Sequence, residues 1–295
     1  MKRLIIPILS AYFSLHCMEK QQGDIQLELR EWDAKAYNKG NSLQTNAFLH
    51  FLEINKIIIE NRTVLDAACG PGRIAARLAQ KAHHVHGFDA SNNMITLAQK
   101  NYEHIRNVTF EQCFAETFTS PKLYQLGIMS SCFHWFQKKE MALQHMYNSL
   151  EFDGEFFADI HTTQDPMPLN LTVFNEMNNE IMEVQNYFKN YPSSHCDSSY
   201  PSLDELKRML YIMGFDIIKA EIQSFDYLMT KKEFKQFQLP IVKSKPGVNK
   251  MPNELFKKFF PLFIERCLSK LEKVHNDTYK YPFTTTIVHA RKVKK

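Results

Sequence analysis

Residues 64–73 read Val-Leu-Asp-Ala-Ala-Cys-Gly-Pro-Gly-Arg, a short apolar run that leads into a glycine turn. Ile58, Ile59, Val64 and Leu65 give an apolar, mostly β-branched run of strand length, and residues 73–81 carry apolar side chains at helical spacing. Because glycine lacks a Cβ, Gly70 and Gly72 allow a sharp turn and let a ligand approach the backbone near a helix N-terminus. The order of strand, turn and helix therefore predicts a nucleotide-type cofactor site.

A second short apolar run ends at Asp89. This carboxylate follows the glycine turn by about 20 residues, the spacing at which an acid accepts hydrogen bonds from ribose hydroxyls. A lone Gly-x-Gly is also typical of a simple turn, so Asp89 is what favours cofactor binding. Residues 70–75 (Gly-Pro-Gly-Arg-Ile-Ala) fit the looser dinucleotide pattern as well, which leaves an NAD-dependent oxidoreductase as an alternative.

Four blocks of sequence resemble class I S-adenosylmethionine (SAM)-dependent methyltransferases. Residues 66–72 (Asp-x-x-Cys-Gly-Pro-Gly) and 87–94 (Gly-Phe-Asp-Ala-Ser-x-x-Met) look like the first two motifs of that class. Residues 124–136 (Tyr-Gln-Leu-Gly-Ile-Met-Ser-Ser-Cys-Phe-His-Trp-Phe) are similar to the fourth-strand motif of the branch that includes trans-aconitate, juvenile hormone acid and malonyl-carrier-protein methyltransferases. Residues 32–37 (Trp-Asp-Ala-Lys-Ala-Tyr) resemble the leader of that branch.

The resemblance implies an α/β fold with a doubly wound, seven-stranded, mainly parallel sheet and a helical leader. Strand and helix patterns alternate through residues 63–160, as expected for such a sheet. Residues 162–200 form an insertion after the fifth strand, which we interpret as a substrate lid within a single domain at 18–295. Beyond it we expect a helix at 203–213 entered through a capping box, a strand at 215–227, a helix at 231–237, a loop at 240–252, a helix at 253–275 and a closing strand at 283–291.

The resemblance also assigns roles to individual residues. Asp66 would orient the amino end of the cofactor's methionine, and Asp89 would accept its ribose hydroxyls. His134 and Trp135 are the candidate catalytic residues: His134 would hydrogen-bond an acceptor oxygen and Trp135 would form the pocket wall. The full cofactor set is Asp66, Ala68, Gly70, Gly72, Asp89, Ala90, Met94, Ala115, Glu116 and Ser131, and the substrate set is Trp32, Tyr37 and Phe133.

Two positions depart from the family pattern. Ala68 stands where the first glycine is usual, and Phe114 stands where an aspartate often precedes the Ala-Glu pair. A non-catalytic protein that binds SAM or a partner on the same fold is therefore a second alternative. We interpret the departures as drift in an active enzyme.

The acceptor is expected to be a small molecule. Methyl transfer from a sulfonium is an in-line displacement that mainly requires alignment in a dry pocket, so a strong base is optional. Residues 124–136 contain no acid. A carboxylate needs none, because its free pKa of about 4 leaves it ionised near neutrality. Chemistry and resemblance thus both favour carboxyl O-methylation of a small acid or acyl carrier.

Composition excludes several other classes. The 295 residues carry 36 basic and 32 acidic side chains, a near-balance that gives no general case for nucleic-acid binding. The six cysteines are scattered without a Cys-x-x-Cys pair, so neither a zinc site nor a disulfide framework is predicted.

The N-terminus allows two interpretations. Residues 1–17 have the basic start and apolar stretch of a secretory signal, but they lack a good cleavage site and are too short to span a bilayer. Translation from Met18 would make them an upstream extension. Because SAM is made in the cytosol, we expect a cytoplasmic enzyme, with secretion following only if residues 1–17 are a true signal.

Overall fold

The computed structural model describes residues 27, 29, 31–40, 42–190, 200–243 and 248–294. The chain divides into two compact units, Met1–Arg30 and Glu31–Lys295, and every element described below belongs to the second. The segment at 1–17 lies outside the described residues. Within the described ranges, no helix is both long enough and apolar enough to cross a membrane.

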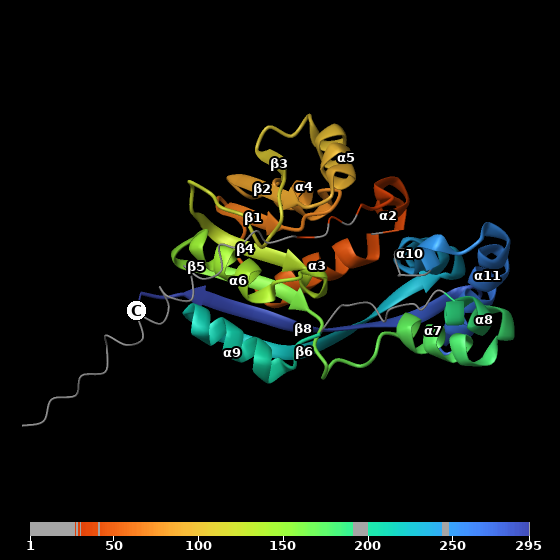
Figure 1. Ribbon diagram of the computed structural model, residues 1–295. Helices are drawn as coiled ribbons and strands as arrows, with labels where there is room; N and C mark the ends of the chain where they lie inside the picture. Colours follow the sequence, from red (N-terminus) through yellow and green to blue (C-terminus); the bar gives the residue numbers. More distant parts are fainter. Residues whose placement is uncertain are drawn as a thin grey trace, which may run out of the picture. The chain divides into compact units, whose positions relative to one another are not determined.

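The second unit is built on one mixed sheet with strand order β3-β2-β1-β4-β5-β8-β6 (Figure 1). Strand β8 (Thr278–Lys292) lies antiparallel between β5 and β6 (Phe215–Thr230), and β7 (Glu272–His275) pairs with β8. The predicted doubly wound, mainly parallel sheet is confirmed, with β7 as an eighth strand. The parallel strands are β1 (Thr63–Ala67), β2 (His84–Asp89), β3 (Val108–Gln112), β4 (Tyr124–Ser130) and β5 (Leu150–Ile160).

Helices cover the sheet on both faces. The capping box predicted for α9 is present, because Ser202 accepts from the backbone N–H of Glu205 and the Glu205 carboxylate accepts from the backbone of Ser202. The helices are α2 (Ala34–Gly40), α3 (Ser42–Ile54), α4 (Arg73–Leu78), α5 (Asn92–Tyr102), α6 (Lys139–Asn148), α7 (Leu169–Glu180), α8 (Met182–Asn190), α9 (Leu203–Met213), α10 (Lys231–Lys243) and α11 (Asn253–Ser269), with short 3-10 turns η1 (Phe133–Trp135) and η2 (Val248–Lys250).

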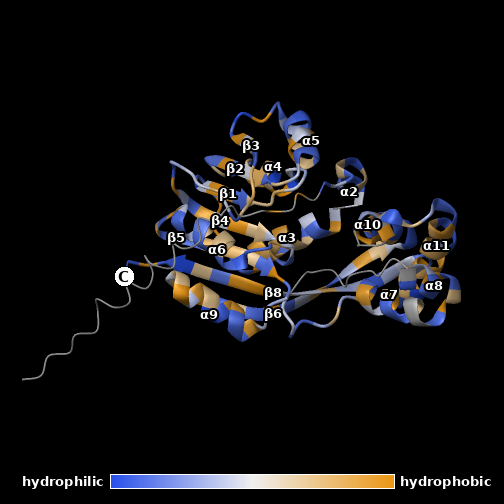
Figure 2. Cartoon of the chain, in the orientation of Figure 1, coloured by the Kyte–Doolittle hydropathy of each residue, from blue (hydrophilic) through white to orange (hydrophobic). Residues whose placement is uncertain are grey.

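Alternating side chains of the strands fill two cores, one on each face of the sheet. Val64 of β1 belongs to the first core and Leu65 to the second, as the two-residue period of a strand requires. Figure 2 shows β4 largely in the hydrophobic colour and helix α5 largely in the hydrophilic one. In the first core, the rings of Phe48 on α3 and Phe157 on β5 lie 5.8 Å apart.

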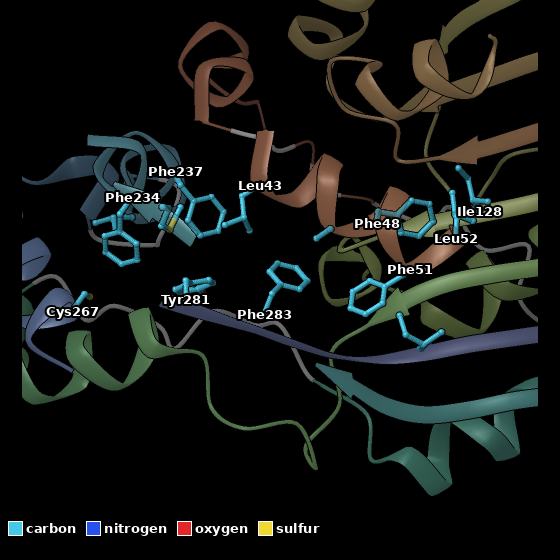
Figure 3. Packing of buried hydrophobic residues seen from close by; sticks show 14 of the residues in the cluster. Leu43, Phe48, Phe51, Leu52, Ile128, Phe234, Phe237, Cys267, Tyr281 and Phe283 are labelled. Carbon is cyan, nitrogen blue, oxygen red and sulfur yellow. The ribbon is translucent and has the colours of Figure 1, made fainter. Parts of the chain in front are cut away.

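The first core continues along β8 beyond the end of β5. Strand β5 stops at the pair Ile160 and Thr286, whereas β6 and β8 remain paired as far as Thr230 and Thr278. Figure 3 shows side chains of α3, β8 and α10 forming one continuous row over this extension. The insertion helices α7 and α8 also pack there, and Phe174 of α7 meets Phe259 of α11 at 6.0 Å.

Several predicted boundaries were wrong after residue 230. Helix α10 continues through Pro240 to Lys243, where we predicted a loop; burial of Phe237, Pro240 and Val242 outweighs the cost of a proline within a helix. Helix α11 ends at Ser269, not at residue 275, because residues 272–275 turn back onto β8 through Asn276, which has a left-handed φ of 44°. Earlier boundaries agree to within a few residues.

Candidate active site

The glycine turn after β1 holds three residues in the left-handed region. The φ values of Ala68, Gly70 and Gly72 are 54°, 54° and 78°. A Cβ placed on Gly72 would lie 2.6 Å from the Phe110 ring, whereas one on Gly70 would meet only Tyr37, at 3.9 Å. Gly72 is therefore needed for packing, and Gly70 leaves the inner surface of the turn open to a ligand.

Asp89, at the end of β2, fastens this turn. Its Oδ2 accepts from the backbone N–H of Gly70 and its Oδ1 from that of Ser91, both at 2.9 Å. Burial raises the pKa of Asp89, and the two backbone hydrogen bonds oppose that shift. The predicted cofactor residues Asp89 and Gly70 are thus in direct contact.

Asp66 is a buried acid that lacks a full set of partners. It is 1% exposed, and its Oδ2 has no hydrogen-bond partner among the described residues. Burial, followed by the charge of Asp89, raises the pKa of Asp66 to about 8. A buried carboxyl oxygen with unused acceptor capacity suits a cationic or N–H-bearing ligand group.

Two contacts hold the leader against the turn and the following helix. Glu31 accepts hydrogen bonds at the N-terminus of α5, from the Ser91 hydroxyl at 2.7 Å and from the backbone N–H of Asn92 at 3.1 Å. Arg73, the first residue of α4, donates to the side chain and backbone oxygens of Asn38 at 2.6 and 2.7 Å. Sequence reasoning missed these contacts, because no local pattern pairs residues this far apart.

Aromatic residues of the leader meet the end of β4. The ring of Trp32 lies 5.4 Å from Trp135 and 5.4 Å from Tyr37, in edge-on arrangements that favour aromatic contact. Tyr37 is inside the site, where burial raises the pKa of its hydroxyl, and it donates to Gln44 at 3.0 Å. The structure therefore joins two predicted substrate residues to the predicted wall residue Trp135.

The other predicted site residues occupy less open positions. Phe133 is 1% exposed and packs against Phe136 in the second core. Glu116 accepts from the backbone N–H of Gln137 at 2.8 Å. Met94 and Ala115 are buried, and the Ala90 carbonyl accepts from Gln112 at 3.0 Å. Their roles toward a cofactor or an acceptor stay predictions.

Ser131 holds a buried acid of β5. Its backbone N–H donates to Asp159 Oδ1 at 3.0 Å, its hydroxyl donates to Oδ2, and its φ of 48° is left-handed. Asp159 is 2% exposed, and burial raises its pKa to about 6 although the Ser131 hydrogen bonds oppose the shift.

Three rings gather at the same edge of the sheet, at the ends of β4 and β5 and before α9. The His134 ring lies 5.8 Å from His161 and 5.6 Å from Tyr200, and His161 lies 6.0 Å from Tyr200. His161 Nδ1 is 3.5 Å from Oδ2 of Asp165. Sequence reasoning missed His161, Asp165 and Tyr200, although His161 directly follows a parallel strand, where such sheets bind ligands. In the described part of the chain, no cluster of three or more His, Cys, Asp or Glu residues could hold a metal ion.

Comparisons with known proteins agree with this geometry. Residues 64–154 match the methyltransferase domain family. A protein of Invertebrate iridescent virus 6 designated methyltransferase 235L is 24% identical over 230 residues, covering 76% of this chain and 80% of the viral one. An uncharacterized RNA methyltransferase of Listeria innocua is 34% identical over 99 residues, which are only 22% of its length. Magnesium protoporphyrin IX methyltransferase of Synechocystis PCC 6803, solved with bound S-adenosylhomocysteine, superposes with a TM-score of 0.50 at 15% identity over 97% of this chain and 98% of that one.

The matched segment contains the glycine turn, Asp89 and the fourth strand, so sequence match and fold coincide on the same edge of the sheet. The segment is therefore similar in sequence to methyltransferase domains, and the chain has the Rossmann-like fold of SAM-dependent methyltransferase structures.

Proposed function

We propose that this protein transfers a methyl group from SAM to a small organic acceptor at the carboxyl edge of the sheet. SAM is its cofactor, and when bound it supplies an activated methyl group on sulfur. The single observation that carries the proposal is the cradle formed by Asp66, Gly70 and Asp89. The turn is open at Gly70, and Asp66 keeps an unpartnered buried oxygen beside the Asp89 carboxylate.

The charges of the cradle fit the cofactor. SAM carries a sulfonium and an ammonium group, and a cation bound nearby favours the ionised form of Asp66 against the burial that raises its pKa to about 8. Asp89 would receive the ribose hydroxyls and Asp66 the amino end of the methionine moiety. The aromatic residues Trp32, Tyr37 and Trp135 would exclude water from the neighbouring acceptor position.

A carboxylic acid is the acceptor class we propose. The resemblance to the carboxyl-methylating branch supports it, and so does the chemistry, because a carboxylate is already ionised and gives up no proton. His134 would donate a hydrogen bond to the acceptor oxygen. Methyl transfer is favoured over the oxidoreductase alternative, since the segment with the glycine pattern matches the methyltransferase domain family.

The test is titration calorimetry of the full chain with SAM and S-adenosylhomocysteine, followed by transfer of labelled methyl to a panel of carboxylic acids. Asp89→Ala should abolish cofactor binding, whereas Asp226→Ala, an exposed acid of β6, should not. Labelled methyl esters are the expected product. Products formed only on amines or carbon atoms would refute carboxyl methylation, and binding without turnover would favour the non-catalytic alternative. Absence of SAM binding by the wild type would refute the proposed function itself.

A further inference from the structure

We propose that His161 and Asp165 form a proton-accepting pair at the acceptor position, which lets the same site methylate hydroxyl groups as well as carboxylates. This inference rests on the proposed methyl transfer. It extends the acceptor class to oxygens that must lose a proton when they are methylated.

The two residues occupy the first turn of chain after β5. His161 follows the last strand residue, Ile160, and its Nδ1 lies 3.5 Å from Asp165 Oδ2. The histidine side chain is 20% exposed and that of Asp165 is 3% exposed. The acid is thus enclosed while the imidazole remains accessible, as a group that exchanges protons with a ligand must be.

Asp165 is fixed from both sides. It accepts from the backbone N–H groups of Thr162 and Thr286 at 3.0 and 3.2 Å, and from their hydroxyls at 3.2 and 2.7 Å. Burial raises the pKa of Asp165, but the hydrogen bonds from His161, Thr286 and Thr162 outweigh it and hold the pKa below its ordinary value. Asp165 is therefore an ionised acceptor near neutrality.

The ionised acid determines which nitrogen of His161 carries the proton. A carboxylate only accepts hydrogen bonds, so the Nδ1 that faces it must carry the hydrogen in the neutral ring. Nε2 then presents a lone pair on the other side of the ring. An imidazole oriented in this way by a buried acid is the arrangement that general bases use.

The position of the ring places that base next to the predicted acceptor. His134, the predicted acceptor-binding residue, lies 5.8 Å from His161 between ring centroids and 4.6 Å from Trp135. Trp135 contacts Trp32, which in turn contacts Tyr37 beside the glycine turn. One continuous wall of rings therefore runs from the cofactor turn to His161.

The reaction balances without a further reactant. The acceptor oxygen forms a bond to the methyl carbon, the carbon–sulfur bond breaks and its electron pair stays on sulfur. The hydroxyl proton passes to Nε2 of His161. The positive charge of the sulfonium thus ends on an imidazolium that Asp165 stabilises.

The experiment compares acceptors that share a scaffold. Full-length protein is assayed with SAM for labelled methyl transfer to two pairs of acceptors. Phenol is compared with benzoate, and octanol with octanoate. We expect the wild type to methylate a hydroxyl member of the panel. His161→Gln should lower kcat/KM for that acceptor by about 10²–10⁴-fold and leave carboxylate acceptors and the Kd for SAM unchanged. The matched control is His289→Gln, which removes a histidine paired with Glu155 at 3.1 Å inside the sheet and should alter neither activity.

Two further readouts separate a base from a structural histidine. The kcat/KM for the hydroxyl acceptor should rise with pH, as expected for a reaction that needs an unprotonated base, and this dependence should disappear in His161→Gln. The titratable groups that face His161 are Asp159 of β5, Asp165, His134 of η1 and Tyr200. The pH dependence of kcat/KM for the carboxylate acceptor serves as the control, because these groups affect both acceptors whereas the base is needed only for the hydroxyl. Nitrogen NMR of the protein without cofactor should show the Nδ1–H tautomer of His161, and Asp165→Asn should change it.

The outcomes separate this inference from the proposed function. Benzoate or octanoate methylation without any hydroxyl product would overturn the inference and leave carboxyl methylation standing. Equal losses on both acceptor classes in His161→Gln, or an Nε2–H tautomer in the wild type, would also overturn it. Failure to bind SAM would overturn both.

Discussion

Gly72→Ala should destabilise the protein in two ways, by straining the backbone of the glycine turn and by disturbing the side-chain packing around it. At a φ of 78°, a residue with a Cβ costs about 1–2 kcal/mol relative to glycine. The new methyl would also lie 2.6 Å from Cζ and 2.7 Å from Cε1 of Phe110, and 3.0 Å from the Ala98 methyl. Displacing a packed ring in this way costs about 1–3 kcal/mol.

The two costs are partly offset because alanine reduces the entropy of the unfolded chain by about 0.4–1 kcal/mol. We therefore expect the free energy of unfolding of Gly72→Ala to fall by about 2–4 kcal/mol. Urea unfolding followed by circular dichroism measures this loss, and an unchanged slope with denaturant would show that the folded states are comparable.

Gly70→Ala is the matched control in the same turn. Its φ of 54° is also left-handed, but its Cβ would meet only Tyr37 at 3.9 Å, so after the same entropy offset only about 0.5–1 kcal/mol should be lost. Gly70→Ala should lower the affinity for SAM by a larger free energy than it lowers the free energy of unfolding, because its methyl projects into the open side of the turn. A Phe110→Leu change should recover stability in Gly72→Ala and not in Gly70→Ala. Equal unfolding energies for the two alanine variants would refute the packing argument.

Three further results follow from the site. Ala68→Gly should raise the free energy of unfolding by about 0.5–1 kcal/mol in urea titrations, because relief of the left-handed strain exceeds the added chain entropy. The pKa of Asp66 rises from 3.8 to about 8 on folding, so between these pH values the folded protein keeps the Asp66 proton and the unfolded chain has lost it. The free energy of unfolding should therefore fall by about 1.4 kcal/mol per pH unit as pH rises through this range. Asp66→Asn should flatten this part of the stability–pH curve. Glu31→Ala should cost about 1 kcal/mol at the N-terminus of α5 and increase hydrogen exchange of the backbone amides of residues 31–40, while an unchanged exchange pattern would contradict the anchoring role.

The contact between the glycine turn and Asp89 was predictable because its sequence pattern is local. The turn at 68–72 and the acid at Asp89 each follow directly from a strand, and parallel pairing of β1 with β2 sets Ala67 opposite Phe88. Once two adjacent parallel strands are correctly assigned, the residues after them must meet at one edge of the sheet. The contact between Asp89 and Gly70 needs no information beyond that.

Elements that depend on distant packing were not predictable in the same way. Pro240 signals a helix end in any local analysis, yet α10 continues past it because its apolar residues are buried in the first core, where Phe234 and Phe237 pack against Tyr281 of β8. Residues 272–275 resemble the end of a helix until β8 is available as a pairing partner. In both cases tertiary burial decides between two local conformations of similar energy.

The residues proposed to surround the acceptor lie between these two cases. Residues that immediately follow the parallel strands are Ala68, Ala90, Cys113, Ser131 and His161, and the topology of the sheet alone places them along its carboxyl edge. Among those five, only His161 carries a side chain whose ordinary pKa lies near neutrality. The position of a base candidate was therefore implicit in the strand boundaries. What required the structure was its partner, because Asp165 is directed toward the imidazole by hydrogen bonds from β8, a strand that enters the sheet from more than one hundred residues further along the chain.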